Sequence, residues 1–317
     1  MIFLIVRLGY VSESSVIQGS TSGRYFLRDL VQDNDFEKLG QVIQANLVHL
    51  KETILYNVKN SVHFYRISSG IIPLSTVQGL SFAYIFPYWS LYLEIRDILK
   101  KSGMRVDFHP NQYCILNSTK QEVIENAIRI LWYHYKLLMA FGVENKVILL
   151  HVGSGQLGRE NALARFLTTF YALPQALQKV IAIENDDKVF TVQDCLFLSR
   201  KCGVLVVIDY HHHCCNPSEG DFSLMVEEIF SLWKKRGMRP KVHFSSPKNR
   251  REYRAHADYI DGERFLSFLD FLRNFSYDVD IMLEVKAQDE ALFRLVREIK
   301  YRRDYVFLDA TSFLIDG

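Results

Sequence analysis

The chain has 317 residues, of which 49% are hydrophobic and 23% are charged. This composition is typical of a globular protein and excludes disordered, collagen-like and coiled-coil chains. Lys and Arg number 38 against 36 Asp and Glu, a net charge of +2, so any contact with nucleic acid has to come from local basic clusters rather than from the charge of the whole molecule.

The N-terminal apolar run ends at Val6 and is followed at once by Arg7. It is too short for a signal peptide or a membrane span, so we expect a first strand and a cytoplasmic protein without a membrane segment. The five cysteines include no C-x-x-C pair, which argues against a disulfide framework and against a cysteine zinc site. We assign no role to the adjacent Cys214 and Cys215.

Eight short β-branched runs alternate with longer segments of helical period. They cover residues 3–8, 62–68, 105–109, 147–152, 181–184, 204–209, 241–244 and 281–284. The alternation predicts an α/β fold with a parallel sheet, and eight repeats match a single (β/α)8 TIM barrel over residues 1–317. A doubly wound open sheet is the alternative, but no glycine-rich phosphate loop follows the first strand.

Capping residues indicate where several helices begin. We expect helices at about 35–58, 120–141, 192–202 and 262–275, the last three capped by Asn117–Thr119, Thr191 and Asp261. The polar stretch Ser12–Gly23 precedes the first helix, and we expect it to be a mobile loop on the top face of the barrel.

Six consecutive predicted strands end in a residue type that binds metals. These residues are His109, His151, Glu184, Asp209, His243 and Glu284. In a barrel of this kind the carboxyl ends of the strands meet in one mouth, where six ionisable groups would be costly to bury unless cations compensated them. The pattern therefore predicts a multinuclear metal centre.

Nitrogen and carboxylate donors without thiolate suit manganese, zinc or iron, and a positive surplus would favour an anionic substrate such as a phosphodiester. His211, His212 and His213 follow Asp209 directly, and the sequence leaves open which of them faces a metal. His256 lies in the loop after the seventh strand and could reach the same face.

Loops at the strand ends also carry groups that suit DNA. Lys188 follows the fifth strand, and Lys248 begins a basic segment after the seventh, where phosphate contact is plausible. Tyr10, Gln112 and Tyr113 lie at strand ends, where they could stack on bases or separate a duplex.

Taken together, these motifs resemble the UV damage endonucleases along essentially the whole chain. The matching segments are Arg-Leu-Gly-Tyr10, Tyr-Arg66-Ile-Ser-Ser69, Phe-His109-Pro-Asn-Gln112-Tyr113, Glu184-Asn-Asp-Asp-Lys188, Asp209-Tyr-His-His212, Lys241-Val-His243-Phe-Ser-Ser-Pro-Lys248 and His256-Ala-Asp-Tyr. The resemblance implies a TIM barrel similar to endonuclease IV and xylose isomerase, with up to three divalent ions, usually Mn²⁺ and alternatively Zn²⁺ or Mg²⁺.

The resemblance also implies roles for single residues. The metal ligands would be His109, His151, Glu184, Asp209, His212, His243, His256 and Glu284. The resemblance matches Lys241 to a lysine of the family that can be carboxylated near the metals. We expect Glu184, Glu284, Asp209 and Lys241 to be the catalytic residues, with Glu184 and Glu284 as the best candidates for bridging carboxylates. Tyr10, Gln112 and Tyr113 would probe the duplex and fill the gap left by a damaged dinucleotide.

The expected activity is a nick in UV-damaged double-stranded DNA immediately 5′ to cyclobutane dimers and 6-4 photoproducts. Metal-assisted hydrolysis would leave 3′-hydroxyl and 5′-phosphate ends. We expect a monomer without an obligate protein partner. The alternatives are a metal-dependent sugar isomerase or epimerase and an abasic-site endonuclease on the same barrel, while a damage-binding protein without cleavage would not need an intact ligand set.

Overall fold

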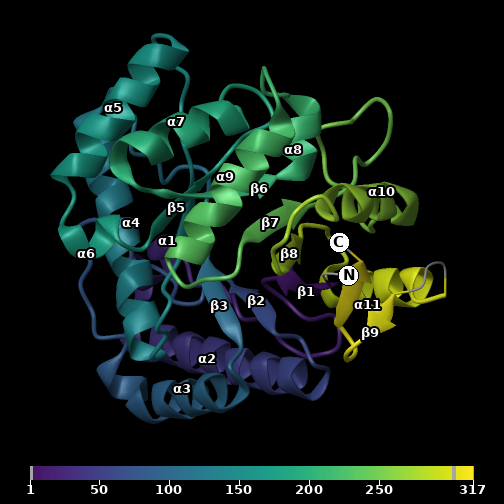
Figure 1. The fold of residues 1–317 in the computed structure, drawn as a ribbon. Coiled ribbons are helices and arrows are strands. Elements are labelled where there is room, and N and C mark those ends of the chain that lie inside the picture. The colour runs from purple at the N-terminus through teal and green to yellow at the C-terminus, as the bar shows by residue number, and fades with distance from the viewer. Residues whose placement is uncertain (1–2, 302–304, 317) are drawn as a thin grey trace.

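The computed structural model describes residues 3–301 and 305–316, and its centre is a closed barrel of eight parallel strands (Figure 1). The strands are β1 (Phe3–Val11), β2 (Phe64–Ile67), β3 (Arg105–Phe108), β4 (Ile148–His151), β5 (Ile181–Glu184), β6 (Leu205–Asp209), β7 (Lys241–Phe244) and β8 (Val279–Leu283). Each strand pairs with the next, and β1 closes the ring by pairing with both β8 and β2. The predicted TIM barrel is confirmed, and the open doubly wound sheet is excluded.

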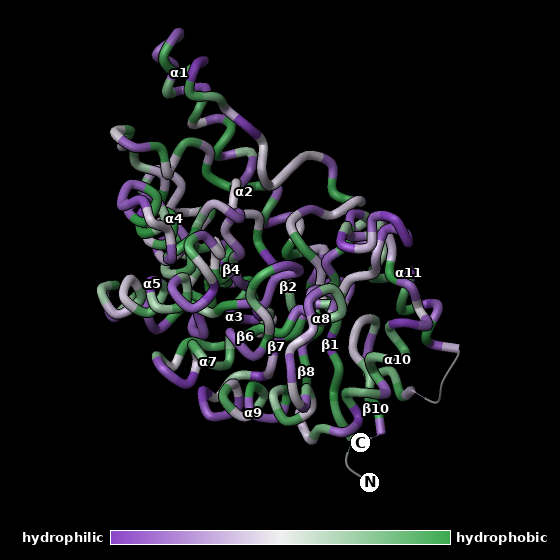
Figure 2. Tube along the Cα trace, turned by 90° about the horizontal axis from the view of Figure 1, so that it is seen from above, coloured by the Kyte–Doolittle hydropathy of each residue, from purple (hydrophilic) through white to green (hydrophobic). Residues whose placement is uncertain are grey.

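Helices surround the strands (Figure 1). They are α1 (Leu27–Asp33), α2 (Phe36–Lys59), α3 (Trp89–Ser102), α4 (Gln121–Ala140), α5 (Arg159–Ala172), α6 (Gln175–Gln178), α7 (Val192–Cys202), α8 (Tyr210–Cys215), α9 (Phe222–Lys235), α10 (Gly262–Leu272) and α11 (Gln288–Ile299), with a 3₁₀ turn, η1 (Phe86–Tyr88). Figure 2 shows the hydrophobic strands in the middle and hydrophilic segments on the helices around them. No helix in the described ranges is both long enough and apolar enough to cross a membrane.

Two of the three predicted caps are confirmed. Thr191 forms a capping box with Asp194 at the start of α7, and Asp261 accepts hydrogen bonds from the first turn of α10. The cap predicted at Asn117–Thr119 is wrong, because α4 begins after Lys120 without a side-chain cap. Asn117 is instead buried and bonds the backbone of Ser154 in the neighbouring loop.

An antiparallel hairpin that the sequence did not indicate extends the sheet. Its strands are β9 (Val306–Phe307) and β10 (Ser312–Asp316), and β10 pairs with the first half of β1, from Phe3 to Arg7. The second half of β1 remains free to pair with β2 at Tyr10 and Val11. One strand thus closes the barrel at one end and holds the hairpin at the other.

Charged side chains fill much of the barrel interior. They lie in layers, because side chains two residues apart on a strand share one face. At the base, the carboxylate of Asp280 accepts hydrogen bonds from Arg7 at 2.7 and 2.8 Å and from Arg105 at 2.9 Å. Above it, Lys241 on β7 pairs with Asp107 on β3 at 2.7 Å. Strands β3 and β7 are not neighbours, so this contact crosses the interior.

The loop Ser12–Gly23 is bonded internally. The Glu13 carboxylate accepts hydrogen bonds from the side chains of Ser20, Thr21 and Ser22, at 2.8 to 3.1 Å. The hydroxyl of Ser14 donates to Asp289 at 2.7 Å. The prediction of a mobile loop is at odds with this network, which fixes the segment against the start of α11.

Candidate metal centre

Glu184, the last residue of β5, is the centre of the barrel mouth. Its Oε1 atom lies 2.7 Å from Nε2 of His109 and 3.2 Å from Nε2 of His151. Its Oε2 atom lies 2.7 Å from Nδ1 of His243. Three predicted ligands from three other strands therefore converge on one carboxylate.

Two groups of metal-ligating atoms share this carboxylate. One contains His109, His151 and Glu184, and the other contains Glu184, His243 and Glu284, with the atoms of each group within 4.8 Å of one another. In the second group, Oε1 of Glu284 lies 3.0 Å from Nδ1 of His243. Glu184 is thus positioned to bridge two cations, whereas Glu284 belongs to only one of the groups.

Asp209 and His212 extend the centre on the side of His151. The buried Asp209 ends β6 and caps α8 by accepting a hydrogen bond from the backbone N–H of His212 at 2.8 Å. The Nδ1 atom of His212 lies 3.0 Å from the carbonyl oxygen of Asn185, which leaves Nε2 available as a ligand. The ring of His212 is 6.2 Å from that of His151 and 5.9 Å from that of His256. Asp209, His212 and His256 are therefore near the centre but outside its two closest groups.

The other two histidines of the run have different surroundings. His213 stacks on Phe222 with ring centroids 3.8 Å apart. His211 is buried, with its Nε2 atom 3.9 Å from the sulfur of Cys215. Of the three, His212 is the one whose ring centroid lies near that of His151, at 6.2 Å. Its role as a ligand stays a prediction.

The carboxylates of the centre outnumber the protein cations that face them. Arg66 contributes one charge, with Nη1 2.5 Å from Oε1 of Glu284. Burial opposes ionisation of Glu184, but the imidazoles around it hold its pKa well below the usual range. At Asp209, burial together with Glu284 and Glu184 raises the pKa to about 7. Bound cations would relieve this crowding of negative charge.

The histidines and several buried atoms without a hydrogen-bond partner fit a site that binds cations. Burial lowers the pKa of His151, and it lowers the pKa of His243 to about 4, so both rings are neutral and can ligate. Buried atoms without a hydrogen-bond partner include Nδ1 of His109, Nδ1 of His151 and Oδ2 of Asp209. Neutral imidazoles and carboxylates with free donor atoms fit divalent metals.

Lys241 lies below these ligands rather than among them. It is fully buried two residues before His243, and its Nζ atom donates to Asp107. Burial lowers the pKa of its ammonium group to about 8, against the opposing effect of Asp107. Carboxylation of Lys241 stays a prediction.

Three of the residues predicted to contact DNA are exposed on the loops around the mouth. Gln112 and Tyr113 follow His109, and Tyr113 is 69% exposed. Lys188 is exposed after β5. These side chains are accessible from the face that carries the metal ligands.

The other two residues predicted to contact DNA bond to protein groups. Lys248 is exposed but donates to Glu252 at 2.8 Å, so its charge is partly engaged. The prediction for Tyr10 is corrected, because this side chain is fully buried and its hydroxyl donates to Asn57 on α2 at 2.7 Å. Along β1 the side chain of Tyr10 points outward to the helix layer, which removes it from any surface that DNA could reach.

Sequence reasoning missed three residues that support the centre. Arg66 at the end of β2 contacts Glu284 and His243, Asp107 pairs with Lys241, and Asn185 bonds both His212 and Asp209. The first two could have been found from the alternation of side chains along a strand, because Arg66 is next to the last residue of β2 and Asp107 lies two residues before His109. Asn185 follows Glu184 directly and carried no separate signal.

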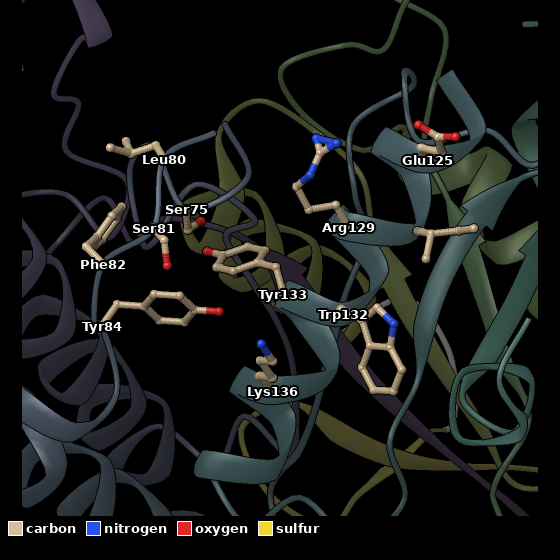
Figure 3. Close-up of a pocket in the computed structure, with 11 residues that line it drawn as sticks. Ser75, Leu80, Ser81, Phe82, Tyr84, Glu125, Arg129, Trp132, Tyr133 and Lys136 are labelled. Carbon is tan, nitrogen blue, oxygen red and sulfur yellow. The ribbon is translucent and has the colours of Figure 1, made fainter. Parts of the chain in front are cut away.

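A separate pocket lies outside the mouth, between the β2–α3 loop and α4 (Figure 3). It has a volume of about 740 Å³ and is lined by Tyr84, Trp132, Tyr133 and the cations Arg129 and Lys136, among others. The hydroxyl of Tyr133 accepts a hydrogen bond from the backbone of Ile72, which fixes the loop to α4. None of the described residues that line this pocket is a histidine, so it is separate from the metal centre.

Comparisons with known proteins agree with this geometry. The family model described as UV-endonuclease UvdE matches residues 6–308. The chain is 36% identical over 301 residues to the UV DNA damage endonuclease of Bacillus cereus (strain G9842), covering 93% of this chain and 95% of that protein. It is 35% identical over 304 residues to the UV DNA damage endonuclease of Bacillus velezensis, covering 93% and 94%.

Solved structures extend the likeness to three dimensions. The crystal structure of SacUVDE is similar with a TM-score of 0.85 and 33% identity, covering 93% of this chain and 98% of that chain. Endonuclease IV from Thermus thermophilus has a TM-score of 0.57 at 14% identity, covering 94% and 100%. An L-ribulose 3-epimerase has a TM-score of 0.56 at 13% identity, covering 96% and 89%. At such low identity the last two indicate the barrel fold alone.

Proposed function

The chain belongs to the UV-endonuclease UvdE family, and on that premise we propose that this UV DNA damage endonuclease cuts duplex DNA immediately 5′ to photoproducts by metal-assisted hydrolysis. One observation carries the proposal. Glu184 lies within 3.2 Å of imidazole nitrogens from β3, β4 and β7, an arrangement that a structural carboxylate does not need but a bridging metal ligand does.

The proposed ligands come from six strand ends and two following segments. They are His109, His151, Glu184, Asp209, His212, His243, His256 and Glu284. Two or three Mn²⁺ or similar ions bound there would activate water and neutralise charge on the scissile phosphate. All eight side chains belong to one chain, so a single copy can hold the complete centre.

The protein groups around these ligands orient them. Arg66 holds Glu284 and His243 at 2.5 and 2.6 Å, which fixes both side chains and adds positive charge where a phosphate would approach. The carbonyl oxygen of Asn185 accepts a hydrogen bond from the Nδ1–H of His212 and so directs Nε2 into the mouth. Lys241 and Asp107 support the ligands from below as positioning residues.

The exposed loop after β3 is the proposed lesion sensor. Gln112 and Tyr113 lie three and four residues after a ligand, so a base step contacted by them is close to the scissile phosphate. Crosslinked pyrimidines stack and pair poorly, and extruding them costs less than the few kcal/mol of an intact step. Damage would therefore be selected by the reduced cost of opening the duplex. Lys188 and Lys248 are proposed to contact phosphates beside the mouth.

The test is an assay on end-labelled duplexes with the metal-loaded protein. One duplex carries a single cyclobutane dimer, one an abasic site and one no damage, and EDTA is added to a parallel set. We expect a chelator-sensitive nick 5′ to the dimer, with 3′-hydroxyl and 5′-phosphate ends, and little cutting of intact DNA. Absence of any nick by protein that demonstrably binds metal would overturn the proposal, and cutting of the abasic duplex alone would reassign the lesion.

A further inference from the structure

Leu157, in the loop between β4 and α5, combines two unfavourable features. Its side chain is 68% exposed, and its backbone has a positive φ of 63°. A left-handed conformation is disfavoured for a residue with a branched side chain, and an exposed leucine gains nothing from burial. Backbone strain of this kind points to a functional constraint when the fold does not require it.

The turn around Leu157 would suit a smaller residue. The N–H of Gly158 donates to the carbonyl of Gly155 at 3.1 Å, which closes a four-residue turn with Leu157 at its third position. A positive φ at that position is normally supplied by glycine or asparagine. Leucine there presents a large apolar group to solvent at the tip of the loop.

The loop is rigid and fixed to its neighbour. Asn161 donates to the carbonyl of Leu157 at 2.9 Å, and Arg165 donates to the carbonyls of Gln156 and Asn117 at 2.5 and 2.8 Å. Asn117 in turn bonds both backbone groups of Ser154. Since Asn117 belongs to the loop that carries Gln112 and Tyr113, the two exposed tips are held at a fixed separation.

The surroundings of Leu157 suit DNA better than a protein partner. The loop leaves β4 directly after the ligand His151, so it lies on the rim of the mouth, and the exposed residues Gln156, Arg159 and Glu160 beside Leu157 are polar or charged. A single apolar tip among polar groups is far too small for a stable protein interface. Apolar side chains of this kind are used as wedges between base steps by proteins that bend DNA.

We propose that Leu157 is an apolar wedge that presses on a base step of the duplex beside the lesion and stabilises a bent DNA. This inference rests on the proposed function. It assigns to the β4–α5 loop a second point of contact, distinct from Gln112 and Tyr113. Two rigid contacts at fixed separation favour a duplex that bends easily, which is the property that damage confers.

The test uses Leu157→Gly and Leu157→Asn, two substitutions that suit a positive φ and remove the apolar group. Leu308→Ala is the matched control, because Leu308 is 51% exposed in the β9–β10 hairpin, away from the mouth. We expect both Leu157 variants to melt at or above the wild-type temperature and to bind metal normally. Their kcat/KM on the dimer duplex should fall at least tenfold, while the control should match the wild type.

Bending is measured separately, by energy transfer between dyes at the ends of a dimer duplex in EDTA, which prevents cutting. Both variants should give less bending than the wild type at saturating protein. Wild-type cutting and bending by either variant would overturn the inference. If the wild type itself does not cut, the proposed function fails, and the bending comparison still decides the role of Leu157.

Discussion

Lys241 and Asp107 form an ion pair of 2.7 Å in which both side chains are fully buried, directly below the metal ligands. The pair crosses the barrel from β7 to β3, and Nε of Arg66 lies 3.8 Å from the same carboxylate. Each partner is two residues before a ligand, Lys241 before His243 and Asp107 before His109. The buried Lys241–Asp107 pair therefore also helps to position His243 and His109, which follow on the same two strands.

Asp107→Asn should destabilise the protein by about 3–5 kcal/mol, because it leaves the buried Lys241 ammonium without its counter-charge. Denaturant unfolding in EDTA measures this loss without a contribution from bound metal. The double variant Asp107→Leu/Lys241→Met removes both charges and should be more stable than Asp107→Asn. If both variants lost the same free energy of unfolding, the unpaired charge of Lys241 would not be the cause of the destabilisation.

Glu184→Gln should reduce bound metal and lower the nicking rate at least a hundredfold, because an amide is a weak ligand and cannot bridge two cations. Affinity for the dimer duplex should change little, since the exposed loops that would hold DNA are intact. Metal analysis, nicking and duplex titration are made on the same preparation. Glu144→Gln, at an exposed glutamate, is the matched control, and full activity of Glu184→Gln would contradict the assignment.

Tyr10→Phe tests the corrected position of Tyr10. The substitution leaves Asn57 buried without its hydrogen-bond donor, and we expect a loss of about 1–3 kcal/mol in the free energy of unfolding. Nicking by the folded variant should equal that of the wild type. Tyr171→Phe, which removes an exposed hydroxyl bonded to the carbonyl of Lys201, should cost much less. Loss of lesion recognition by a stable Tyr10→Phe protein would restore the original prediction of a DNA contact.

The strands and the ligands at their ends could be predicted from the sequence because both follow local rules. β-branched runs indicate strands, parallel strands place their carboxyl ends together, and His109, His151, Glu184, Asp209 and His243 occur where those runs end. Closure of the ring then brings residues far apart in sequence within hydrogen-bond distance. Periodicity and the number of repeats are therefore sufficient to predict the fold.

What could not be predicted depends on contacts between elements. The β9–β10 hairpin is short, and its pairing with the first half of β1 depends on tertiary packing. The position of Tyr10 near a strand end predicts a surface residue, but the pleat of β1 directs its side chain outward to α2. The period of two along a strand predicts that Arg66 and Asp107 face the barrel interior, but their partners Glu284 and Lys241 come from other parts of the barrel.

His134 on α4 provides a prediction about pH. Its ring packs against Phe108 and Tyr133, with centroids 4.9 and 4.7 Å away, and Nδ1 lies 2.8 Å from the carbonyl oxygen of Ile130. Burial, with a smaller contribution from the nearby His109, lowers its pKa from 6.5 to about 4, against the opposing effect of the hydrogen bond to Ile130. The folded protein therefore holds His134 neutral where the unfolded chain is already protonated.

Since the unfolded state binds the additional proton, stability contributed by His134 is complete above about pH 6.5 and falls as the pH decreases toward 4. The full loss is about 3 kcal/mol, from 1.4 kcal/mol per unit of pKa. His134→Phe preserves an aromatic ring in the same packing and removes the titration. The difference in unfolding free energy between the wild type and this variant, measured in EDTA, should therefore shift in favour of the variant as the pH falls from 6.5 to 4. A difference that stays constant over this range would show that His134 is protonated in the folded protein as readily as in the unfolded chain.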